Sequence, residues 1–276
     1  MKDLIKLKDY AGEDRVIDSF AMREHLKNIP QAATFKTISG LDKFINGFMP
    51  TEVIVVSGPT GSGKTLFCQT LTYKLQEQDC VPMWLQFENT ASEFHRRFAT
   101  LGLPYFVQPM KNVHHKIDWV EDRLGEAIVK YGANCLFVDH LHYLFDIYQS
   151  RNSSLEIGQI MRELKRIVIE YNIFIVLMAH MTKIPPRVEP DMGHLRDSGM
   201  IAAESDIVLI VWRDYNNKDV KDGGLIKVNK NRREGIIDMP HHPAVCSVRK
   251  IDGVFREVDE VHEENGRINY HEDKIF

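Results

Sequence analysis

The chain has 276 residues, of which 43% are hydrophobic and 27% charged, and its formal net charge at pH 7 is −4. This composition is ordinary for a water-soluble globular protein, and the length suits one large α/β domain. The negative net charge argues against a protein coated in positive charge. It leaves nucleic-acid binding open, because phosphate contacts need only a local basic track.

Neither the apolar segments nor the cysteines predict a membrane or secreted protein. No apolar run approaches the roughly 20 residues of a membrane-spanning helix, and residues 1–15 lack the apolar core of a secretory signal. The four cysteines are scattered without CxxC spacing, so they predict neither a zinc site nor a disulfide framework. We therefore expect a protein of a reducing cytoplasm that makes no membrane contact.

Residues 1–36 are mixed and highly charged and are expected to form an N-terminal extension, with one helix near residues 15–26. From residue 38 onward, short apolar segments alternate with stretches of helical periodicity. Each segment is typical of a strand buried on both faces, as strands of a parallel sheet usually are. The predicted strands are residues 53–56, 83–87, 136–138, 174–178, 207–211 and 225–228.

The clearest predicted helix covers residues 155–171, where apolar residues form one stripe at spacings of three and four. Strands that alternate with helices imply a mostly parallel central sheet flanked by helices, which is the α/β fold class. The later strands lie closer together, so hairpins are expected to complete the sheet, with an edge strand near residues 253–258. An acidic, turn-rich tail is expected at residues 258–276.

A phosphate-binding loop is the strongest signal in the sequence. Residues 58–65 fit the motif G-x-x-x-x-G-K-[ST] without a mismatch, between a predicted strand and a helix predicted at residues 66–75. The glycines let backbone N–H groups turn toward phosphate oxygens, and the helix N-terminus adds its dipole. The alternative, a chance glycine-rich turn, fits this setting poorly. The expected nucleotide-binding residues are Gly58, Pro59, Thr60, Gly61, Ser62, Gly63, Lys64 and Thr65.

Two residues of this loop and one distant carboxylate have expected individual roles. Lys64 is expected to reach the β- and γ-phosphates, and the Thr65 hydroxyl to help hold Mg²⁺. Asp139 ends an apolar predicted strand and suits a second place on the Mg²⁺ side, although an aspartate there can also simply cap a turn. The sequence therefore predicts a site for ATP, or another nucleoside triphosphate, together with Mg²⁺.

Two further polar residues end predicted strands, at the edge where a parallel sheet binds nucleotides. Glu88 is a candidate base that orients and deprotonates the attacking water, and its alternative role is that of a glutamate at a helix start. His180 is a candidate to hydrogen-bond the γ-phosphate and respond to its loss. The alternative for His180 is an ordinary structural histidine.

Four segments around these residues carry a family resemblance. They are a lead-in with a threonine/glycine turn at residues 37–48, Gln-Phe-Glu at 86–88, Val-Asp-His-Leu-His-Tyr-Leu at 138–144 and Ala-His-Met-Thr-Lys at 179–183. With them the chain resembles the catalytic domain of DnaB-type replicative ring helicases and the helicase half of phage primase–helicases. In that resemblance they supply the catalytic glutamate, a second acidic motif that is often Asp-Tyr-Leu-Gln, and the phosphate sensor. Histidine at the sensor position is typical of the phage group.

Two more matches separate this family from other P-loop enzymes. Residues 194–199, His-Leu-Arg-Asp-Ser-Gly, resemble a motif placed near the DNA channel. Residues 227–232 resemble a strand whose Lys-x-Arg end reaches the nucleotide site of the neighbouring subunit. The resemblance thus implies that Lys230 and Arg232 act in trans, with Arg232 as the arginine finger. Without the resemblance, both would be interpreted as a solvated basic turn.

The resemblance implies a RecA-like P-loop NTPase core at residues 37–257 and a homo-oligomer, expected to be a hexameric ring. It also implies a bacterial or phage-infected cell, or an organelle matrix, as the setting. Only about 36 residues precede the match, so no primase is expected within this sequence. We expect the N-terminal helix to link subunits, and a primase or loader to be a separate partner.

Three functions stay open. The leading one is an ATP-dependent ring helicase that moves along single-stranded DNA through a central channel and unwinds duplex. The second is a RecA/RadA/KaiC-like ATPase that assembles on DNA or protein without separating strands, and the third is a loading or regulatory ATPase. Candidate DNA contacts are Lys183, Arg187 and Arg196, in a loop after the sensor strand, with a plain surface loop as the alternative.

Overall fold

The computed structural model describes residues 9–29, 32–98, 102–112, 116–144, 153–185, 188–195, 198–213, 223–237 and 245–257. The chain divides into two compact units, Met1–Ala33 and Thr34–Phe276. The central sheet and the candidate site both belong to the larger unit.

The smaller unit contains helix α1, Ser19–Lys27. Asp18 caps its first turn, because its carboxylate accepts hydrogen bonds from the backbone N–H groups of Phe20 and Ala21. The helix therefore begins later than the predicted residue 15. It buries none of its own residues.

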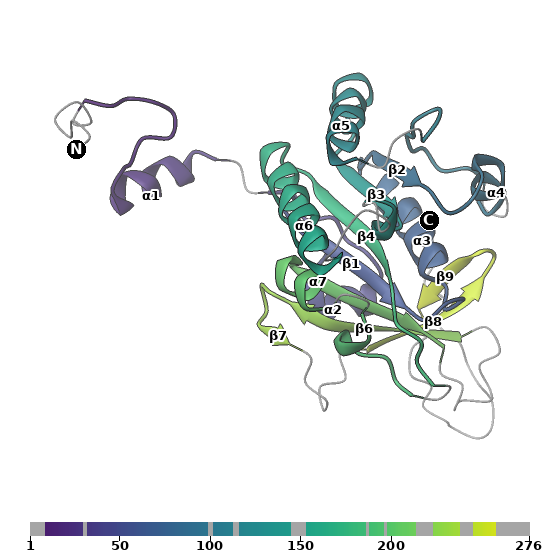
Figure 1. Ribbon diagram of the computed structural model, residues 1–276. Coiled ribbons are helices and arrows are strands. Elements are labelled where there is room, and N and C mark those ends of the chain that lie inside the picture. Colours follow the sequence, from purple (N-terminus) through teal and green to yellow (C-terminus); the bar gives the residue numbers. More distant parts are fainter. Residues whose placement is uncertain are drawn as a thin grey trace. The chain divides into compact units, whose positions relative to one another are not determined.

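In the larger unit, nine strands of the described chain form one sheet flanked by helices (Figure 1). The strands are β1 (Val53–Gly58), β2 (Pro82–Gln86), β3 (Cys135–Asp139), β4 (Phe174–His180), β5 (Ile207–Trp212), β6 (Gly223–Asn231), β7 (Ile236–Ile237), β8 (Val245–Ile251) and β9 (Val254–Glu257). Their order is β2-β3-β4-β1-β5-β6-β8-β9, and β7 pairs with β6.

Strands β1 to β5 pair in parallel, whereas β6 to β9 pair in antiparallel fashion. The predicted parallel core, completed by later hairpins, is therefore confirmed. Side chains in β1, β2, β3 and β5 are buried along the whole strand. This burial agrees with the apolar runs in the sequence and with the rule that parallel strands are covered on both faces.

Helices cover both faces of the sheet. The described helices of the larger unit are α2 (Ser39–Ile45), α3 (Lys64–Gln76), α4 (Ala91–Arg96), α5 (Ile117–Tyr131), α6 (Ser153–Glu170) and α7 (Ser198–Glu204), with short 3₁₀ helices η2 (Leu141–Leu144) and η3 (Met192–His194). Alternate side chains of β1 enter different cores, as the pleat requires. Ile54 and Val56 pack with residues of α2 and α3, while Val53 and Val55 pack with residues of α5 and α6.

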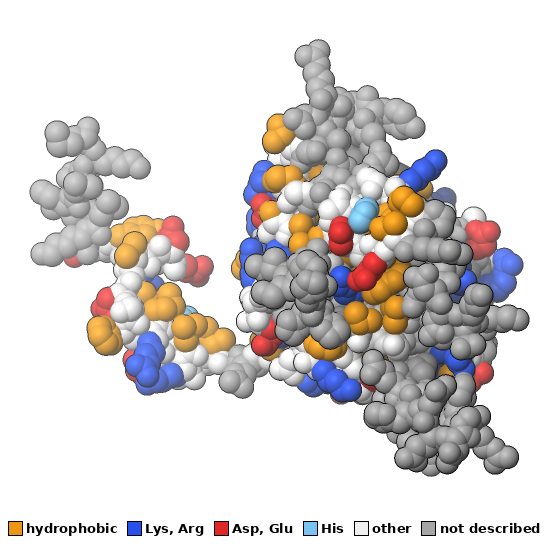
Figure 2. Space-filling model, turned by 90° about the horizontal axis from the view of Figure 1, so that it is seen from below, with side chains coloured by type: hydrophobic (Ala, Val, Ile, Leu, Met, Phe, Trp, Pro, Cys, Tyr) orange, Lys and Arg blue, Asp and Glu red, His pale blue; other side chains and the backbone are white. Residues whose placement is uncertain are grey.

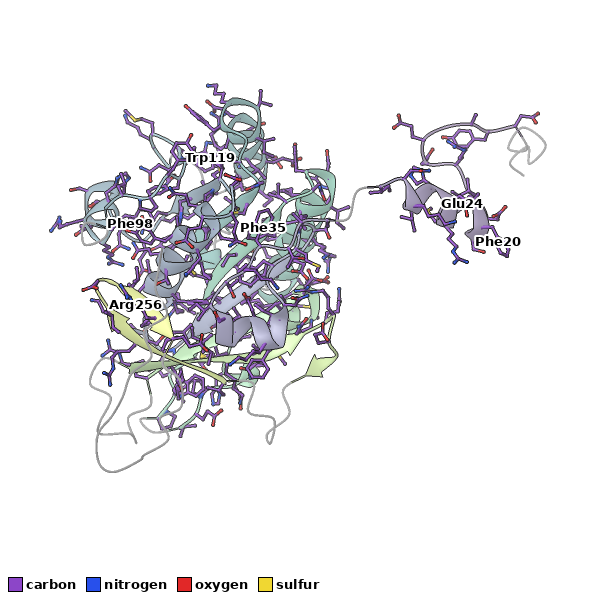
Figure 3. The ribbon with its side chains drawn as sticks, turned by 180° about the vertical axis from the view of Figure 1, so that it is seen from behind. Phe20, Glu24, Phe35, Phe98, Trp119 and Arg256 are labelled. Atoms are coloured by element: carbon purple, nitrogen blue, oxygen red, sulfur yellow. The ribbon has the colours of Figure 1, made fainter. Side chains whose placement is uncertain are left out.

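Figure 3 labels side chains from both cores. Phe35 and Phe98 belong to the core on the α3 side, and Trp119 packs against the core on the α5 side. In the space-filling view, the described Lys and Arg side chains are scattered among Asp and Glu rather than gathered in one patch (Figure 2). The surface drawn there thus agrees with the small negative net charge.

The register of the sheet brings three expected site residues, Gly58, Asp139 and His180, to one edge. Gly58 pairs with His180, and Gln86 pairs with Asp139. Because β1 to β4 are parallel, all their carboxyl ends meet at this edge, which is where open α/β sheets bind ligands.

Candidate active site

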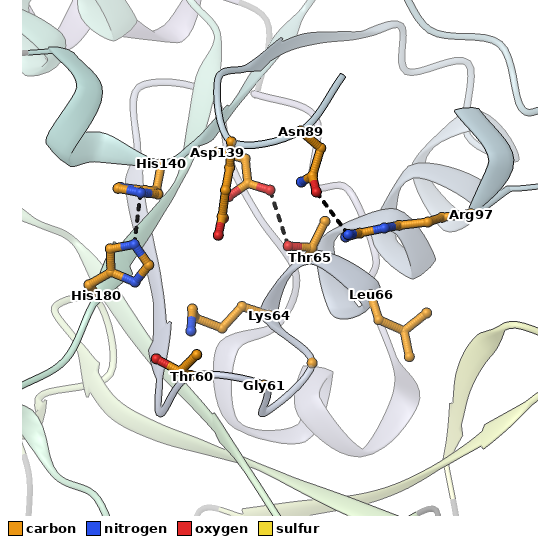
Figure 4. Close-up of a pocket in the computed structure, with 12 residues that line it drawn as sticks. Thr60, Gly61, Lys64, Thr65, Leu66, Asn89, Arg97, Asp139, His140 and His180 are labelled. Carbon is orange, nitrogen blue, oxygen red and sulfur yellow. Dashed lines mark hydrogen bonds between the residues drawn. The ribbon is translucent and has the colours of Figure 1, made fainter. Parts of the chain in front are cut away.

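A cavity of about 290 Å³ lies at the carboxyl edge of the parallel strands (Figure 4). Its walls come from the phosphate loop, the first turn of α3, the segment after β2, the end of α4 and the ends of β3 and β4. The lining residues are Thr60, Gly61, Gly63, Lys64, Thr65, Leu66, Glu88, Asn89, Arg97, Asp139, His140 and His180. The cavity therefore brings together the expected residues Lys64, Thr65, Glu88, Asp139 and His180.

Two glycines give the phosphate loop its shape. Gly58 has φ 155° and Gly63 has φ 101°, and both values lie in the region that only glycine adopts readily. A Cβ on Gly58 would come within 2.0 Å of the carbonyl oxygen of Val211, and one on Gly63 within 2.8 Å of the Phe255 ring. The loop thus depends on these glycines for close packing as well as for backbone conformation.

The hairpin of β8 and β9 packs against the phosphate loop. The ring of Phe255, in β9, lies against Gly63. Its backbone N–H donates a 2.9 Å hydrogen bond to Thr70 Oγ1, on the helix that follows the loop. Glu257, at the end of the same strand, accepts a 2.9 Å hydrogen bond from the backbone N–H of Gly40.

The phosphate loop contains groups suited to phosphate oxygens. Lys64 Nζ donates hydrogen bonds to the carbonyl oxygens of Gly58 at 2.9 Å and Pro59 at 3.1 Å. Burial lowers the pKa of Lys64, while the charges of Asp139 and Glu88 act in the opposite direction. Ser62 Oγ is buried, and it has no hydrogen-bond partner among the described residues. A phosphate group in the loop would supply acceptors for both side chains.

Thr65 and Asp139 form an oxygen-rich corner of the cavity. Thr65 Oγ1 donates a 3.1 Å hydrogen bond to Asp139 Oδ2 (Figure 4). Burial, and then the nearby charge of Glu88, raise the pKa of Asp139 to about 6. A cation at this corner would offset the cost of ionising Asp139, and hydroxyl and carboxylate oxygens are the donors that Mg²⁺ prefers. The residues present therefore fit the expected metal.

Glu88 is exposed, and it lines the same cavity as Asp139. Its alternative role as the residue that starts a helix is filled by others. Thr90 is the N-cap of α4, and Thr90 and Glu93 form a reciprocal capping box. Glu88 is thus available to a ligand in the cavity.

His180 is paired with a histidine that the sequence analysis did not single out. The Nε2 atoms of His180 and His140 are 2.7 Å apart (Figure 4), and their ring centroids are 3.8 Å apart. Burial, followed by the neighbouring His180 and His142, lowers the pKa of His140 to about 3. The His140 ring is therefore neutral at pH 7.

Three other lining residues were missed as site residues, namely Leu66, Asn89 and Arg97. Arg97, directly after α4, donates a 3.0 Å hydrogen bond from Nη2 to Asn89 Oδ1 (Figure 4). The phosphate motif ends one residue before Leu66, and Asn89 directly follows Glu88, so adjacency alone could have indicated both. Arg97 enters the cavity through the course of α4, for which the sequence offers no spacing signal.

Lys230 and Arg232 do not line the cavity. Lys230 Nζ donates 2.6 Å hydrogen bonds to the carbonyl oxygens of Ala202 and Ser205, at and beyond the last turn of α7. Arg232 Nη1 forms a 3.3 Å ion pair with Asp206 Oδ1, directly before β5. These contacts lie at the amino edge of the parallel strands, opposite the cavity.

The length of β1 separates the two edges. Asp206 accepts a hydrogen bond from the N–H of Val53, the first residue of β1, whereas Gly58 ends the strand at the cavity. Five residue steps of about 3.3 Å each place the edges about 16 Å apart. Arg232 therefore does not reach the phosphate loop of its own chain.

The three candidate DNA contacts are described only in part. Lys183 is exposed and follows β4, while Arg187 and Arg196 lie outside the described residues. The described residues before and after this segment are joined by a hydrogen bond, since the backbone N–H of Thr182 donates to the carbonyl oxygen of His194 at 2.9 Å.

Across the described residues, no helix combines the length and apolar character needed to cross a membrane.

Together, the parallel sheet and the phosphate loop define a RecA-like P-loop ATPase domain. The chain belongs to the DnaB-like helicase C-terminal domain family, whose family model matches residues 105–242, half of the chain. A second family model, that of the ATPase KaiC, matches residues 35–105. The predicted family and fold class are confirmed.

Curated relatives of the chain are replicative helicases. A probable replicative DNA helicase of Trieres chinensis is 26% identical over 219 residues, which make up 66% of this chain and 48% of that protein. A probable plasmid replicative DNA helicase of Chlamydia psittaci is 30% identical over 140 residues, or 49% of this chain and 30% of that protein. The chain thus spans about half or less of the length of these relatives.

Solved structures show the same fold at low sequence identity. The ATPase domain of G40P has a TM-score of 0.69 at 15% identity, and the match covers 87% of this chain and 97% of that one. A DnaB-like replicative helicase, whose structure was described with its interactions with primase, has a TM-score of 0.72 at 16% identity. That match covers 87% of this chain and 68% of the other.

Proposed function

We propose that the chain is the motor domain of an ATP-dependent, ring-forming replicative DNA helicase, which hydrolyses ATP to move along single-stranded DNA and unwind duplex. The observation that carries the proposal is the cavity in which Lys64, Thr65, Asp139, Glu88 and His180 meet. Membership of the DnaB-like family and the replicative helicases among its relatives support the same function. The KaiC match covers only the segment with the phosphate loop, so it favours an ATPase without favouring the alternative functions.

The phosphate loop would bind the triphosphate of ATP. Backbone N–H groups of residues 58–65 and the N-terminus of α3 surround the phosphate oxygens, and Lys64 donates to the β- and γ-phosphates. Thr65 and Asp139 would hold Mg²⁺, which neutralises charge on the phosphate oxygens when it is bound.

Hydrolysis then requires an activated water and a group that responds to the γ-phosphate. Glu88 accepts a proton from the attacking water, because its carboxylate lies at the cavity and is exposed to solvent. His180 donates a hydrogen bond to a γ-phosphate oxygen. When the γ-phosphate leaves, that hydrogen bond is lost, and the end of β4 changes its contacts.

The proposed active site is completed by a neighbouring copy of the chain. Lys230 and Arg232 are about 16 Å from the nucleotide edge of their own sheet, and this distance supports a role in trans. Arg232 acts as the arginine finger, because a planar guanidinium suits the charge spread over the γ-phosphoryl oxygens. The assembly would be a homo-oligomer, a hexameric ring, with residues 1–36 linking subunits, residues 37–257 as the motor and residues 258–276 as a tail.

DNA would contact the segment that follows the sensor strand. Lys183, Arg187 and Arg196 supply positive charge for phosphates, which predicts salt-dependent binding with little sequence preference. One helicase of similar structure was described together with its interactions with primase. By analogy, we propose that a primase or a loader is a further binding partner of this chain.

Hydrolysis and strand displacement together test the proposed function. The chain should hydrolyse ATP, hydrolyse it faster with single-stranded DNA and displace a strand from a forked duplex. Lys64→Ala should abolish all three activities, because it removes the charge that meets the phosphates. DNA-stimulated hydrolysis without strand displacement would favour a non-unwinding ATPase, and normal turnover in Lys64→Ala would refute the nucleotide site.

A further inference from the structure

The two histidines at the ends of β3 and β4 form a closed pair. His180 lines the cavity, and His140 follows Asp139, a residue of the proposed metal corner. A distance of 2.7 Å between the two Nε2 atoms requires that one nitrogen carry a proton and the other accept it. The two rings therefore cannot choose their tautomers independently.

The surroundings of His140 decide between the two arrangements. The His140 ring is buried, so any N–H that it carries needs an acceptor within the protein. Its Nδ1 atom is also buried and has no hydrogen-bond partner among the described residues. A buried N–H without an acceptor is rarer than a buried acceptor without a donor. The proton of His140 therefore belongs on Nε2, where it has a partner.

We propose that His140 is a positioning residue for the phosphate sensor. It donates its Nε2–H to His180 Nε2, and this leaves the single N–H of a neutral His180 on Nδ1, as a donor to the γ-phosphate oxygen. The inference rests on the proposed function, because it assumes a nucleotide in the cavity. A glutamine sensor would always offer an amide N–H, whereas a histidine sensor needs a neighbour that fixes its tautomer.

The backbone around His140 keeps the ring in place. Its carbonyl oxygen accepts a 3.1 Å hydrogen bond from the N–H of Tyr143, and the Tyr143 ring lies 4.5 Å away between centroids. In Figure 4 the His180 ring lies between His140 and Lys64. One side of the sensor is thus held by β3, while the ring itself borders the nucleotide cavity.

The tautomers can be read directly by nitrogen NMR of the full chain labelled with ¹⁵N-histidine. The signals are assigned with His140→Gln and His180→Gln. We expect a protonated Nε2 in His140, and in His180 a bare Nε2 with a protonated Nδ1. The opposite assignment, with His180 donating to His140, would overturn the inference.

Nucleotide binding supplies the second readout. His140→Leu removes the donor at similar bulk, and the loss of a neutral hydrogen bond should lower the preference for ATP over ADP by about 2- to 10-fold. His140→Gln keeps an N–H near the Nε2 position and should restore the preference. His95→Leu removes a half-buried histidine that does not line the cavity, and it should keep the preference.

The outcomes separate this inference from the proposed function. Lys64→Ala with unchanged nucleotide affinity would refute the nucleotide site itself. Suppose that nucleotide affinity falls in Lys64→Ala, while folded His140→Leu keeps its preference for ATP over ADP. This result would refute only the role of His140. Equal loss in the Leu and Gln variants, with the His180 tautomer unaltered in both, would make His140 a packing residue and also overturn the inference.

Discussion

Replacing Asp139 with asparagine removes a negative charge from a side chain that is only 2% exposed. The pKa of Asp139 in the folded chain is about 6, against an ordinary value of 3.8. Because the pKa is higher in the folded chain, protonation of Asp139 favours folding. This contribution to the free energy of unfolding is complete well below pH 3.8 and is lost as the pH rises through about 6. The difference corresponds to about 3 kcal/mol at pH 7. Without nucleotide and Mg²⁺, Asp139→Asn should therefore be more stable than the wild type by up to this amount.

Urea unfolding of the metal-free and nucleotide-free chain measures this gain. The gain should be present at pH 7 and should disappear well below pH 3.8, where Asp139 is protonated in both the folded and the unfolded chain. Asp122→Asn, on the exposed face of α5, is the matched control and should change stability little. Mg²⁺ and ATP at about 1,000 times their Kd for the wild type should reverse the order, since a ligand at that excess adds about 4.1 kcal/mol to the chain that binds it.

Two results would refute this reasoning. A less stable Asp139→Asn chain at pH 7 would mean that the ionised carboxylate is favourable in the empty site. A gain of the same size at pH 4 would mean that the substitution acts through packing and not through charge. Either result would mean that ionised Asp139 does not lower the stability of the empty site, so that a bound cation has no such cost to offset.

Three other substitutions test the remaining roles. Glu88→Gln should keep nucleotide binding and oligomer formation but slow hydrolysis by about 10²–10⁴-fold, and normal turnover would exclude Glu88 as the base. Arg232→Ala should fold normally, because the Arg232 side chain is 58% exposed and Lys165 still pairs with Asp206 at 2.7 Å, yet lose about 10³-fold or more in hydrolysis. Mixing it with Glu88→Gln subunits should restore activity, and a fully active monomer would exclude the trans role. Joint replacement of Lys183, Arg187 and Arg196 by alanine should weaken single-strand binding and its salt dependence, and unchanged affinity would exclude this segment.

The sequence predicted the parallel core well because burial on both faces leaves continuous apolar runs. The strands predicted at 136–138 and 174–178 are each extended in the structure, to Cys135–Asp139 and Phe174–His180. Asp139 and His180 end these strands at the cavity, where the sequence had placed them. Each apolar run stops before its polar residue, but the pairing of the strand with its neighbour continues through that residue.

The residues that sequence reasoning missed are those brought in by tertiary packing. His140 adjoins Asp139, but its pairing with His180 depends on the parallel register of β3 and β4, forty residues apart in the chain. Arg97 directly follows α4, which packs on the α3-side core through the buried Phe94, and this packing brings Arg97 to the cavity. The intrachain contacts of Lys230 with the end of α7 were also unpredicted, since no local pattern encodes them.

The support of the phosphate loop by β9 has a consequence for synthesis of the chain. The loop is translated early, but the Phe255 ring that packs on Gly63, and the Phe255 N–H that bonds Thr70, are translated almost 200 residues later. While the chain is still growing on the ribosome, the phosphate loop therefore exists without its rear support. A nascent chain that ends before β9 should bind ATP weakly, and full nucleotide affinity should come only once the last described strand has left the ribosome.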